Sequence, residues 1–348
     1  MTEALVVDDS HFMRTVISDI LADGGVDVVD TAGNGREAVE AVERLDPDVV
    51  TMDVEMPEMD GIEAVEEIMD RHPVPVLMLS ALTTEDADAT LEAMEKGAVD
   101  TFAKPGGTIS TELSGHSEEL VAAVEDVAAA DPTAGHGVEQ TASTSGDAVD
   151  DEAFVDHPTL LIGASTGGPN VVESILGSLP RAADFRVLVV QHMPAQFTSR
   201  FARRLDHASE YDIAEAEDGA RIGGGEGLVA RGDYHMRVAG YSRGRLRVRL
   251  DQNERKHSVR PAIDVTMESA ADRVTDPLVA AVLTGMGTDG AAGVEAVKEA
   301  GGTTLAQDEE TSAVFGIPQR AIETGCVDDV LPADRLTEAI TDSIRRSS

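Results

Sequence analysis

The chain has 348 residues, the length of about two domains, and 42% of them are hydrophobic, which is enough to bury ordinary cores and excludes wholesale disorder. Its 66 acidic residues against 27 basic ones give a net charge of −39, which repels phosphate backbones and anionic lipids and argues against a nucleic-acid binder. The sequence shows no apolar run near the roughly 20 residues of a membrane span and no signal peptide, so we expect a cytoplasmic protein without membrane insertion. It has only one cysteine, Cys326, so we expect neither an internal disulfide nor a Cys-based metal site.

The first 128 residues alternate short apolar runs with amphipathic stretches. The apolar runs are Ala4–Val7, Val26–Val29, Val49–Met52, Val76–Leu79 and Val99–Phe102. Between them, apolar side chains recur about once per helical turn, as in Phe12, Val16 and Ile20. Strands that alternate with helices form a parallel sheet covered on both faces. Five such units predict a flavodoxin-like (βα)5 domain over residues 1–128.

Polar side chains follow the predicted strands of this domain, where a single one would be an ordinary turn residue or helix cap. They are Asp8, Asp9, Asp53, Ser80 and Lys104. The carboxyl edge of an open parallel sheet is where ligands bind. Three carboxylates that converge there repel one another unless a hard cation such as Mg²⁺ neutralises them. One carboxylate can then attack a phosphoryl group whose oxygens the lysine and the hydroxyl hold, so the sequence predicts a phosphoacceptor site.

An acidic stretch separates this domain from the second half of the chain. Residues 131–157 contain seven acidic residues and no lysine or arginine, a composition typical of a flexible linker, which we place at 129–157. The alternation then resumes, with strands expected at Leu160–Ile162, Val187–Val190 and Val279–Leu283 and a helix at Val171–Leu179. Residues 228–250 resemble hairpins with Gly turns. We therefore predict a doubly wound, mainly parallel α/β hydrolytic domain with a β-hairpin insertion over residues 158–346.

Three motifs of the second domain predict a hydrolytic triad. The turn GASTGGP does not fit a dinucleotide-binding fingerprint, which needs glycine where Ser165 stands, but fits the G-x-S-x-G elbow of a nucleophile. A serine needs a base, and His192 in QHMP follows the next strand. Asp289 in LTGMGTDG follows another buried strand and can orient that histidine. The order Ser, His, Asp differs from that of α/β-hydrolases, which disfavours an ordinary esterase fold.

Residues 1–125 resemble a two-component receiver domain through VVDDS, MDVEMPEMDGIE, LMLSAL and FAKPGG. The resemblance implies that Asp53 accepts a phosphoryl group from a chemotaxis histidine kinase. The implied Mg²⁺ ligands are Asp8, Asp9, Asp53 and the backbone carbonyl of Glu55. The implied contacts of the phosphoryl group are Ser80 and Lys104.

The second half resembles the chemotaxis protein-glutamate methylesterases through IGASTGGP, VVQHMPAQFTSRFARRL and LTGMGTDGAAG. Three further motifs extend the resemblance to nearly the whole chain: EDGARIGGGEGLVARGDYHM, VRPAIDV and AQDEETSAVFGIPQRAIETG. It implies that Ser165 attacks a γ-glutamyl methyl ester on a chemoreceptor, that His192 passes the proton to methanol, and that Asp289 holds the imidazole tautomer. The backbone N–H groups of Met286 and Thr166 would stabilise the oxyanion. Deamidation of receptor glutamines would pass through the same acyl-enzyme. The resemblance also implies that the esterase chemistry needs no cofactor and that the protein is a monomer.

The sequence leaves some alternatives open. The second half could be a non-enzymatic output domain that binds a protein partner, because motif order alone implies the triad. Its control by phosphorylation could be a gate, in which the unphosphorylated receiver covers the Ser165 edge. His257, Arg260 and Asp264 resemble a family segment near the active site, but Arg260 and Asp264 could also form an ion pair where a helix starts at Pro261.

The charge composition has its own interpretation. Only four of the 27 basic residues are lysines, and the acidic residues are spread along the whole chain. Such a surface suits a protein kept soluble in concentrated salt better than one evolved for a basic partner, so we expect a halophile. The stretch RLRVRLDQNERKH at 245–257 is more charged than expected for the family.

Overall fold

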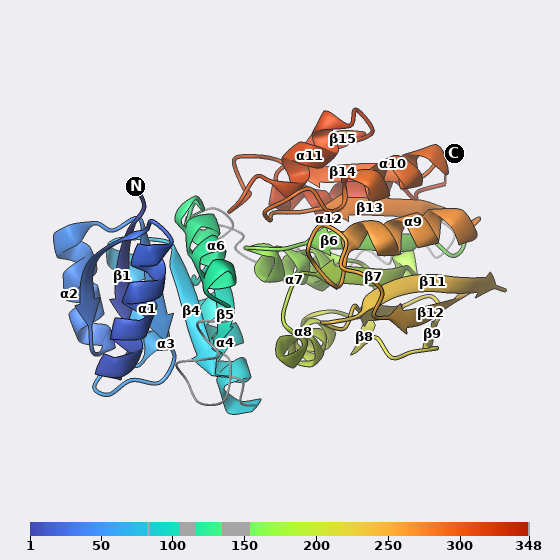
Figure 1. The fold of residues 1–348 in the computed structure, drawn as a ribbon. Coiled ribbons are helices and arrows are strands. Elements are labelled where there is room, and N and C mark those ends of the chain that lie inside the picture. The colour runs from blue at the N-terminus through green and yellow to red at the C-terminus, as the bar shows by residue number, and fades with distance from the viewer. Residues whose placement is uncertain (82–83, 105–115, 134–153, 347–348) are drawn as a thin grey trace. The chain divides into compact units, whose positions relative to one another are not determined.

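The computed structural model describes residues 1–81, 84–104, 116–133 and 154–346. The chain forms two compact units, Met1–Ala134 and Gly135–Ser348, and each is considered by itself (Figure 1). Among the residues described, none of the helices combines the length and the apolar character that a membrane crossing requires.

The first unit is built on a five-stranded sheet of order β2-β1-β3-β4-β5, in which all neighbouring strands are parallel. The strands are β1 (Glu3–Val7), β2 (Asp27–Ala32), β3 (Val49–Asp53), β4 (Val76–Ala81) and β5 (Asp100–Lys104). The helices are α1 (His11–Asp23), α2 (Gly35–Leu45), α3 (Gly61–Arg71), α4 (Thr84–Glu95) and α6 (Ser117–Ala128). Helices α1 and α6 pack together on one face, and α2, α3 and α4 form a row on the other (Figure 1). This strand order confirms the flavodoxin-like prediction.

Side-chain caps start three of these helices directly after the loops at the carboxyl edge of the sheet. Ser10 accepts a hydrogen bond from Met13 N at the start of α1. Asn34 and Asp60 do the same for Glu37 N and Glu63 N, at 2.9 and 2.8 Å. Caps of this kind satisfy N–H groups that a helix leaves without an internal partner. They fix the residue at which each of these helices begins.

The second unit contains a seven-stranded sheet of order β15-β14-β13-β6-β7-β10-β8, again with only parallel pairs. The strands are β6 (Thr159–Ala164), β7 (Arg186–Gln191), β8 (Asp212–Glu215), β10 (Glu226–Val229), β13 (Leu278–Val282), β14 (Thr303–Gln307) and β15 (Asp329–Leu331). The first of them, β6, lies inside the sheet between β7 and β13, so the chain winds outward in both directions. This arrangement confirms the doubly wound prediction, and it places a topological switch point at the ends of β6 and β13.

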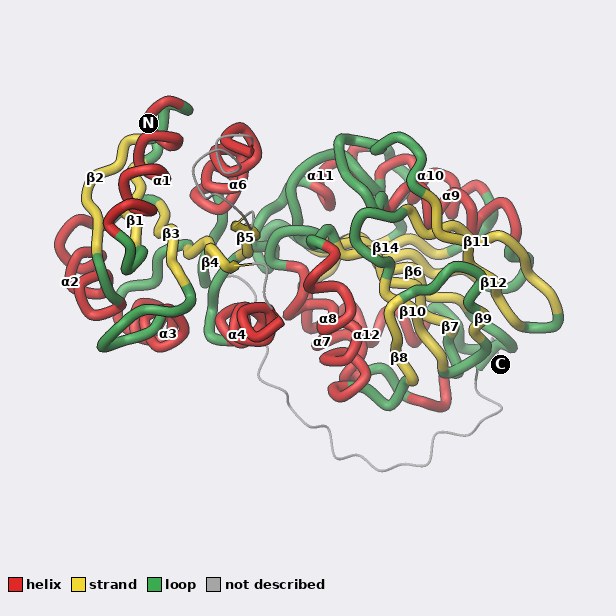
Figure 2. Tube along the Cα trace, turned by 60° about the horizontal axis from the view of Figure 1, so that its bottom comes forward, coloured by secondary structure: helices red, strands yellow, loops and turns green. Residues whose placement is uncertain are grey.

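Helices cover both faces of this sheet (Figure 2). One layer holds α7 (Gly168–Ser178), α8 (Ala195–Ala208) and α12 (Ala333–Asp342), and the other holds α9 (Ile263–Arg273), α10 (Ala291–Glu299) and α11 (Ile317–Glu323). Side chains that alternate along β6 enter two separate cores, Leu160 and Ile162 on one side and Leu161 on the other. Because both faces are buried, such strands appear in the sequence as continuous apolar runs.

The insertion forms a separate antiparallel sheet of order β11-β12-β9. Its strands are β9 (Arg221–Ile222), β11 (His235–Ser242) and β12 (Arg245–Asp251), and α9 packs against β11 (Figure 1). The hairpin prediction is therefore right for β11 and β12 and wrong at its start. Leu228 and Val229 belong to β10, which joins the parallel sheet because both side chains are buried beside β7.

Candidate active and phosphorylation sites

In the first unit, the predicted polar residues meet at the carboxyl edge of the sheet. Lys104 at the end of β5 places its Nζ 2.8 Å from Asp8 Oδ2 and 2.7 Å from Asp53 Oδ1. The carboxylates of Asp8, Asp9 and Asp53 have oxygens within 4.8 Å of one another. Asp8 is buried, and Asp9 is exposed. Asp53 and Lys104, both distant in sequence from the adjacent Asp8 and Asp9, therefore complete one cluster with them, in which the ammonium group contacts Asp8 and Asp53.

The electrostatics of this cluster fit a divalent cation. Burial, aided by the nearby Asp8, raises the pKa of Asp53 to about 6, although Lys104 and the Val54 N–H lower it. One ammonium group thus only partly compensates the converging carboxylates. Carboxylate and carbonyl oxygens are the ligands that Mg²⁺ takes in proteins. The donor set is therefore suited to this ion, which would supply charge neutralisation.

Two further predicted residues flank the cluster. Ser80 is fully buried in β4, and its pairing partner in β5 is Ala103, the neighbour of Lys104. Glu55 is exposed and follows Asp53 by two residues. Gly61 closes this loop, because a Cβ there would lie 2.0 Å from the carbonyl oxygen of Asp53. Only glycine lets α3 begin so close to the end of β3.

In the second unit, Ser165 lies on a tight turn between β6 and α7. Its backbone N–H donates to Thr284 O at 3.0 Å, and its carbonyl accepts from Gly168 N at 2.8 Å. The turn at 284–290 approaches so closely that a Cβ on Gly285 would lie 2.5 Å from Ser165 Cβ. Gly285 also has a φ of 151°, which side-chain-bearing residues rarely adopt. The two glycine-rich motifs of the sequence thus interlock at the switch point.

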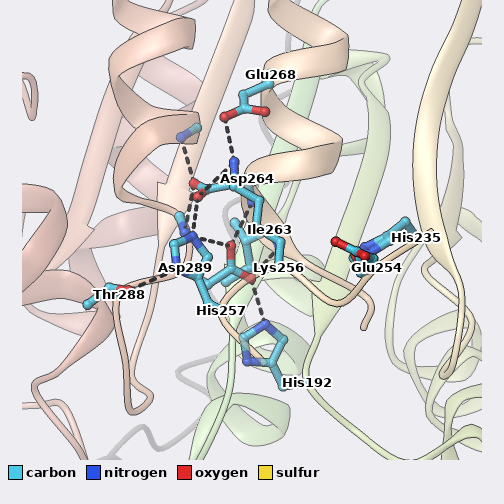
Figure 3. Close-up of polar contacts among 12 residues, drawn as sticks. His192, His235, Glu254, Lys256, His257, Ile263, Asp264, Glu268, Thr288 and Asp289 are labelled. Carbon is cyan, nitrogen blue, oxygen red and sulfur yellow. Dashed lines mark hydrogen bonds and ion pairs between the residues drawn. The ribbon is translucent and has the colours of Figure 1, made fainter. Parts of the chain in front are cut away.

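His192 and Asp289 form the predicted pair. His192 Nε2 lies 2.9 Å from Asp289 Oδ2, and the side chains are 12% and 2% exposed (Figure 3). Asp289 also accepts the N–H groups of Ile263 and Asp264, at 2.6 and 3.0 Å. Burial alone would raise the pKa of Asp289, but His192 and these N–H donors together lower it. The carboxylate is therefore held ionised, and Nδ1 is the ring atom of His192 left to accept a proton.

Adjacent strands bring His192 to the Ser165 turn. His192 N donates to Ala164 O at 3.0 Å, directly before Ser165. The buried Gln191 side chain donates to the carbonyls of Ser165 and His192, at 2.7 and 3.2 Å, and so ties the two turns together. Within the part of the chain that the structure describes, no hydrogen bond joins the Ser165 hydroxyl to His192. Contacts between nucleophile and base are often looser before substrate binds.

The two predicted oxyanion donors flank the same turn. Thr166 is buried next to Ser165, and its carbonyl accepts from Thr284 Oγ1 at 2.9 Å. Met286 follows Gly285, and its side chain is unusually exposed for a methionine, at 37%. Among the described residues, the backbone N–H of Met286 has no hydrogen-bond acceptor. It is therefore available to a negatively charged oxygen.

A second His–Asp pair, which the sequence does not predict as a pair, lies beside Asp289 (Figure 3). His257 Nε2 is 2.8 Å from Asp264 Oδ2, and Lys256 Nζ is 3.3 Å from the same oxygen. Asp264 is fully buried and accepts N–H groups of Gly290 and Gly293. His257, Asp264 and Asp289 also have possible metal-ligating atoms within 4.8 Å of one another, but backbone donors and Lys256 already engage these carboxylates.

The expected alternative of an Arg260–Asp264 ion pair is wrong. Arg260 donates instead to the carbonyls of Gln252 and Asn253, both at 3.0 Å. Helix α9 begins at Ile263, after Pro261, so Asp264 points toward α10. Gln191 could have been predicted as a residue of the site, because it directly precedes His192. The contact between Asp264 and Gly290 could not, because nothing local in the sequence links these two residues.

Comparisons with known proteins agree with this geometry. Residues 160–340 match the CheB methylesterase family, and residues 4–111 match the response regulator receiver domain. The chain is 80% identical to a protein-glutamate methylesterase/protein-glutamine glutaminase of Halobacterium salinarum over 348 residues, all of both chains. It is 56% identical to a protein of the same name from Haloarcula marismortui, over 98% of this chain and 97% of that one.

A solved structure supports the same conclusion for the second unit. The catalytic domain of the Thermotoga maritima CheB methylesterase is 40% identical, with a TM-score of 0.51, and the match covers 54% of this chain and 98% of that one. The salt-loving relatives fit the acidic, lysine-poor composition and an origin in a halophile. The chain therefore belongs to the family of the protein-glutamate methylesterases/protein-glutamine glutaminases, hydrolytic enzymes that here carry a response regulator receiver domain.

Proposed function

We propose that the chain hydrolyses γ-glutamyl methyl esters on chemoreceptors, deamidates receptor glutamines, and is activated by phosphorylation of Asp53. The names of its relatives support the substrate class. The observation that carries the chemistry is the pair of the largely buried His192 and the buried Asp289, with His192 Nε2 and Asp289 Oδ2 2.9 Å apart at the switch point beside Ser165. We place the receiver at residues 1–128, the linker at 129–157 and the catalytic domain at 158–346, in a cytoplasmic monomer.

In this mechanism, Ser165 Oγ attacks the ester carbonyl and His192 takes its proton at Nδ1, because Nε2 is held by Asp289. The N–H of Met286, together with that of Thr166, receives the tetrahedral oxyanion; one such donor is worth roughly 3–4 kcal/mol in the transition state. His192 then protonates departing methanol, or ammonia when the substrate is glutamine. Water attacks the acyl-enzyme and gives a proton to His192, which passes it to Ser165 Oγ as the bond to the serine breaks and glutamate is released.

The receiver residues have their own proposed roles. Asp8, Asp9, Asp53 and the carbonyl of Glu55 would hold Mg²⁺, which neutralises charge during phosphoryl transfer. The Asp53 carboxylate accepts the phosphoryl group from a chemotaxis histidine kinase, and Lys104 moves from its contact with Asp53 to the phosphoryl oxygens. Ser80 contacts the same oxygens. Asp53→Asn should abolish labelling by acetyl phosphate, and labelling that persists would refute the assignment.

The test of the esterase is methanol release from methyl-labelled receptor membranes in molar KCl. We expect release by the native chain, none above background by Ser165→Ala, and an increase when acetyl phosphate and Mg²⁺ are added. Ser209→Ala, which changes a serine whose side chain exchanges hydrogen bonds with the backbone of Tyr211, is the matched control and should retain activity. No release by the native chain, with Asp53 still phosphorylated, would favour a non-enzymatic output domain.

Control by phosphorylation is proposed to act as a gate, in which the unphosphorylated receiver covers the Ser165 edge. A catalytic domain of this family has been solved by itself, so a fragment without the receiver can be tested. Deletion of residues 1–130 should raise the basal rate of methanol release. A fragment no faster than the unphosphorylated full chain would rule out simple occlusion.

A further inference from the structure

One face of the antiparallel insertion sheet carries an unusual concentration of positive charge. We call it the arginine face, and its residues are Arg221, Arg237, Arg245, Arg247 and Arg249. Side chains between them in β12, Leu246 and Val248, are buried against the core, so the arginines point to the opposite, exposed side. This cluster occurs in a chain whose acidic residues outnumber its basic ones by 66 to 27. With this composition, a surface patch of the same size would be expected to carry more acidic than basic residues.

The arginines face one another across the strands. Arg247 pairs with Arg221, and Arg249 pairs with Arg237 in the register of the sheet. Like charges directly opposite each other destabilise a sheet. Arg237 and Arg245 have ion-pair partners, but among described residues Arg221, Arg247 and Arg249 contact no carboxylate. An anionic partner from outside would remove this repulsion.

The spacing of the face fits an acidic helix. Alternate residues of a strand are about 7 Å apart, so Arg245, Arg247 and Arg249 form a row with that repeat. Carboxylates four residues apart on a helix are about 6 Å apart along its axis. The row ends beside a hollow of about 430 Å³, lined by Arg221, Tyr241 and the other arginines of this end. A helix with a carboxylate on each successive turn can therefore contact the row without bending.

A short segment of the chain links the strand that carries the arginine row to the catalytic region. Strand β12 ends at Asp251, and five residues later Lys256 contacts Asp264, whose backbone N–H donates to Asp289. In concentrated salt, charges act only over a few Å, so forked guanidinium–carboxylate contacts, more than long-range attraction, decide binding. An acidic protein segment is favoured over nucleic acid because the substrate proposed above is itself a protein, and its carboxylates can make these forked contacts.

We propose that the arginine face binds an acidic helical segment of the receptor while Ser165 acts on a glutamyl ester elsewhere on that receptor. This inference rests on the function proposed above. It makes the face a determinant of receptor affinity that does not take part in bond breaking. A small ester, which cannot reach the face, should be hydrolysed independently of it.

The test variant is R247E/R249E, and R203E/R335E is the matched control, because these are exposed arginines of α8 and α12 with the same change in charge. Methanol release is measured against the concentration of methylated receptor membranes in molar KCl, and in parallel with the γ-methyl ester of a blocked glutamate. We expect the KM for receptor membranes to rise about tenfold in R247E/R249E. The kcat, the hydrolysis of the small ester and all parameters of the control should stay native. An unchanged KM would overturn the proposal.

Binding is measured separately, so that failure of the esterase function does not hide the result. The S165A variant is combined with either pair of arginine substitutions, and the fraction of protein that sediments with receptor membranes is measured. This fraction should fall with R247E/R249E and stay constant with R203E/R335E. If the native chain releases no methanol, the proposed function fails, and this sedimentation still decides the role of the face. Equal loss of binding to receptor-free vesicles, or arginine-dependent binding to duplex DNA, would overturn the assignment to an acidic protein segment. If circular dichroism shows that R247E/R249E is unfolded, R247Q/R249Q replaces it. The KM of this variant for receptor membranes should then lie between the native value and ten times the native value.

Discussion

Asp289 and Asp264 cap each other's helices. Asp289 accepts the N–H groups of Ile263 and Asp264 at the start of α9, and Asp264 Oδ1 accepts those of Gly290 and Gly293 at the start of α10, at 2.9 and 2.7 Å. Each carboxylate thus occupies the positive end of the other helix, where an anion is stabilised. The exchange ties the carboxylate that contacts His192 to the starts of two helices (Figure 3).

The first prediction concerns this reciprocal capping. Asp264→Ala should lower the free energy of unfolding by roughly 3 kcal/mol, because two N–H groups of α10 lose their acceptor in a buried site. The kcat should fall as well, since the 284–290 turn carries Asp289. Asp264→Asn keeps one carbonyl oxygen for both N–H groups and should lose much less stability. Equal losses in urea denaturation of the two variants would show that the caps are unimportant.

The second prediction concerns the proposed role of Asp289, which is to orient His192. Asp289→Asn should keep the fold, because the amide oxygen still accepts a backbone N–H, but should reduce kcat roughly 10⁴-fold with little change in KM, because the imidazole tautomer is no longer fixed. Steady-state methanol release measures both parameters. Asp272→Asn removes an equal charge from an exposed position of the same unit and should leave kcat unchanged. A kcat within tenfold of native in Asp289→Asn would contradict the assigned role.

The third prediction separates steric contact from backbone strain in the 284–290 turn. A methyl group on Gly285 would meet Ser165 Cβ at 2.5 Å, whereas one on Gly287, with a φ of 100°, would meet no atom within 4 Å. Gly285→Ala should therefore displace the nucleophile and reduce kcat about 100-fold. Gly287→Ala should lower stability by about 1 kcal/mol while kcat stays near native. Similar kcat values for the two variants would exclude close packing against Ser165 as the reason for Gly285.

The fourth prediction concerns proton binding at Asp53. Burial raises the pKa of this carboxyl to about 6, and Lys104 acts in the opposite direction. In metal-free protein, the carboxyl should titrate near pH 6, and Lys104→Met should move the titration to higher pH, because the ammonium group no longer favours the ionised form. Added Mg²⁺ should move it to lower pH. Carbon NMR of the Asp53 carboxyl measures this, with Lys96→Met, which changes a lysine paired with Glu66, as the control. A shift to lower pH in Lys104→Met would contradict the contact.

The fifth prediction concerns the stability of the receiver. Burial, together with Asp100 and Glu125, raises the pKa of Asp126 in α6 to about 6. A raised folded pKa contributes stability below the unfolded pKa of 3.8 that is lost as the pH rises through about 6. Asp126→Asn should therefore stabilise the fold at pH 7.5, by about 1 kcal/mol after solvent screening of this half-exposed group, and less at pH 5. Glu119→Gln on the same helix is the control, and a gain independent of pH would contradict the explanation.

Local patterns in the sequence were sufficient to predict most of the elements and to place most residues of the candidate site at one edge of a sheet. Continuous apolar runs such as Val187–Val190 indicate strands buried on both faces, and parallel strands expose their carboxyl ends at one edge. Ser165 and His192 follow such runs within three residues, and Asp289 follows one after the glycine-rich turn, so their placement at one edge could be predicted without coordinates. The same argument placed Asp53 and Lys104 together.

The tertiary structure alone decided which groups touch. Asp264 contacts Gly290 and Arg247 lies opposite Arg221, pairs separated by 26 residues whose proximity depends on helix orientation and strand register. Likewise β10 joined the parallel sheet because its side chains could be buried beside β7, although its own sequence is equally compatible with a hairpin. Periodicity reports which face of an element is buried, but the partner across that face is chosen by packing and hydrogen-bond satisfaction over the whole domain.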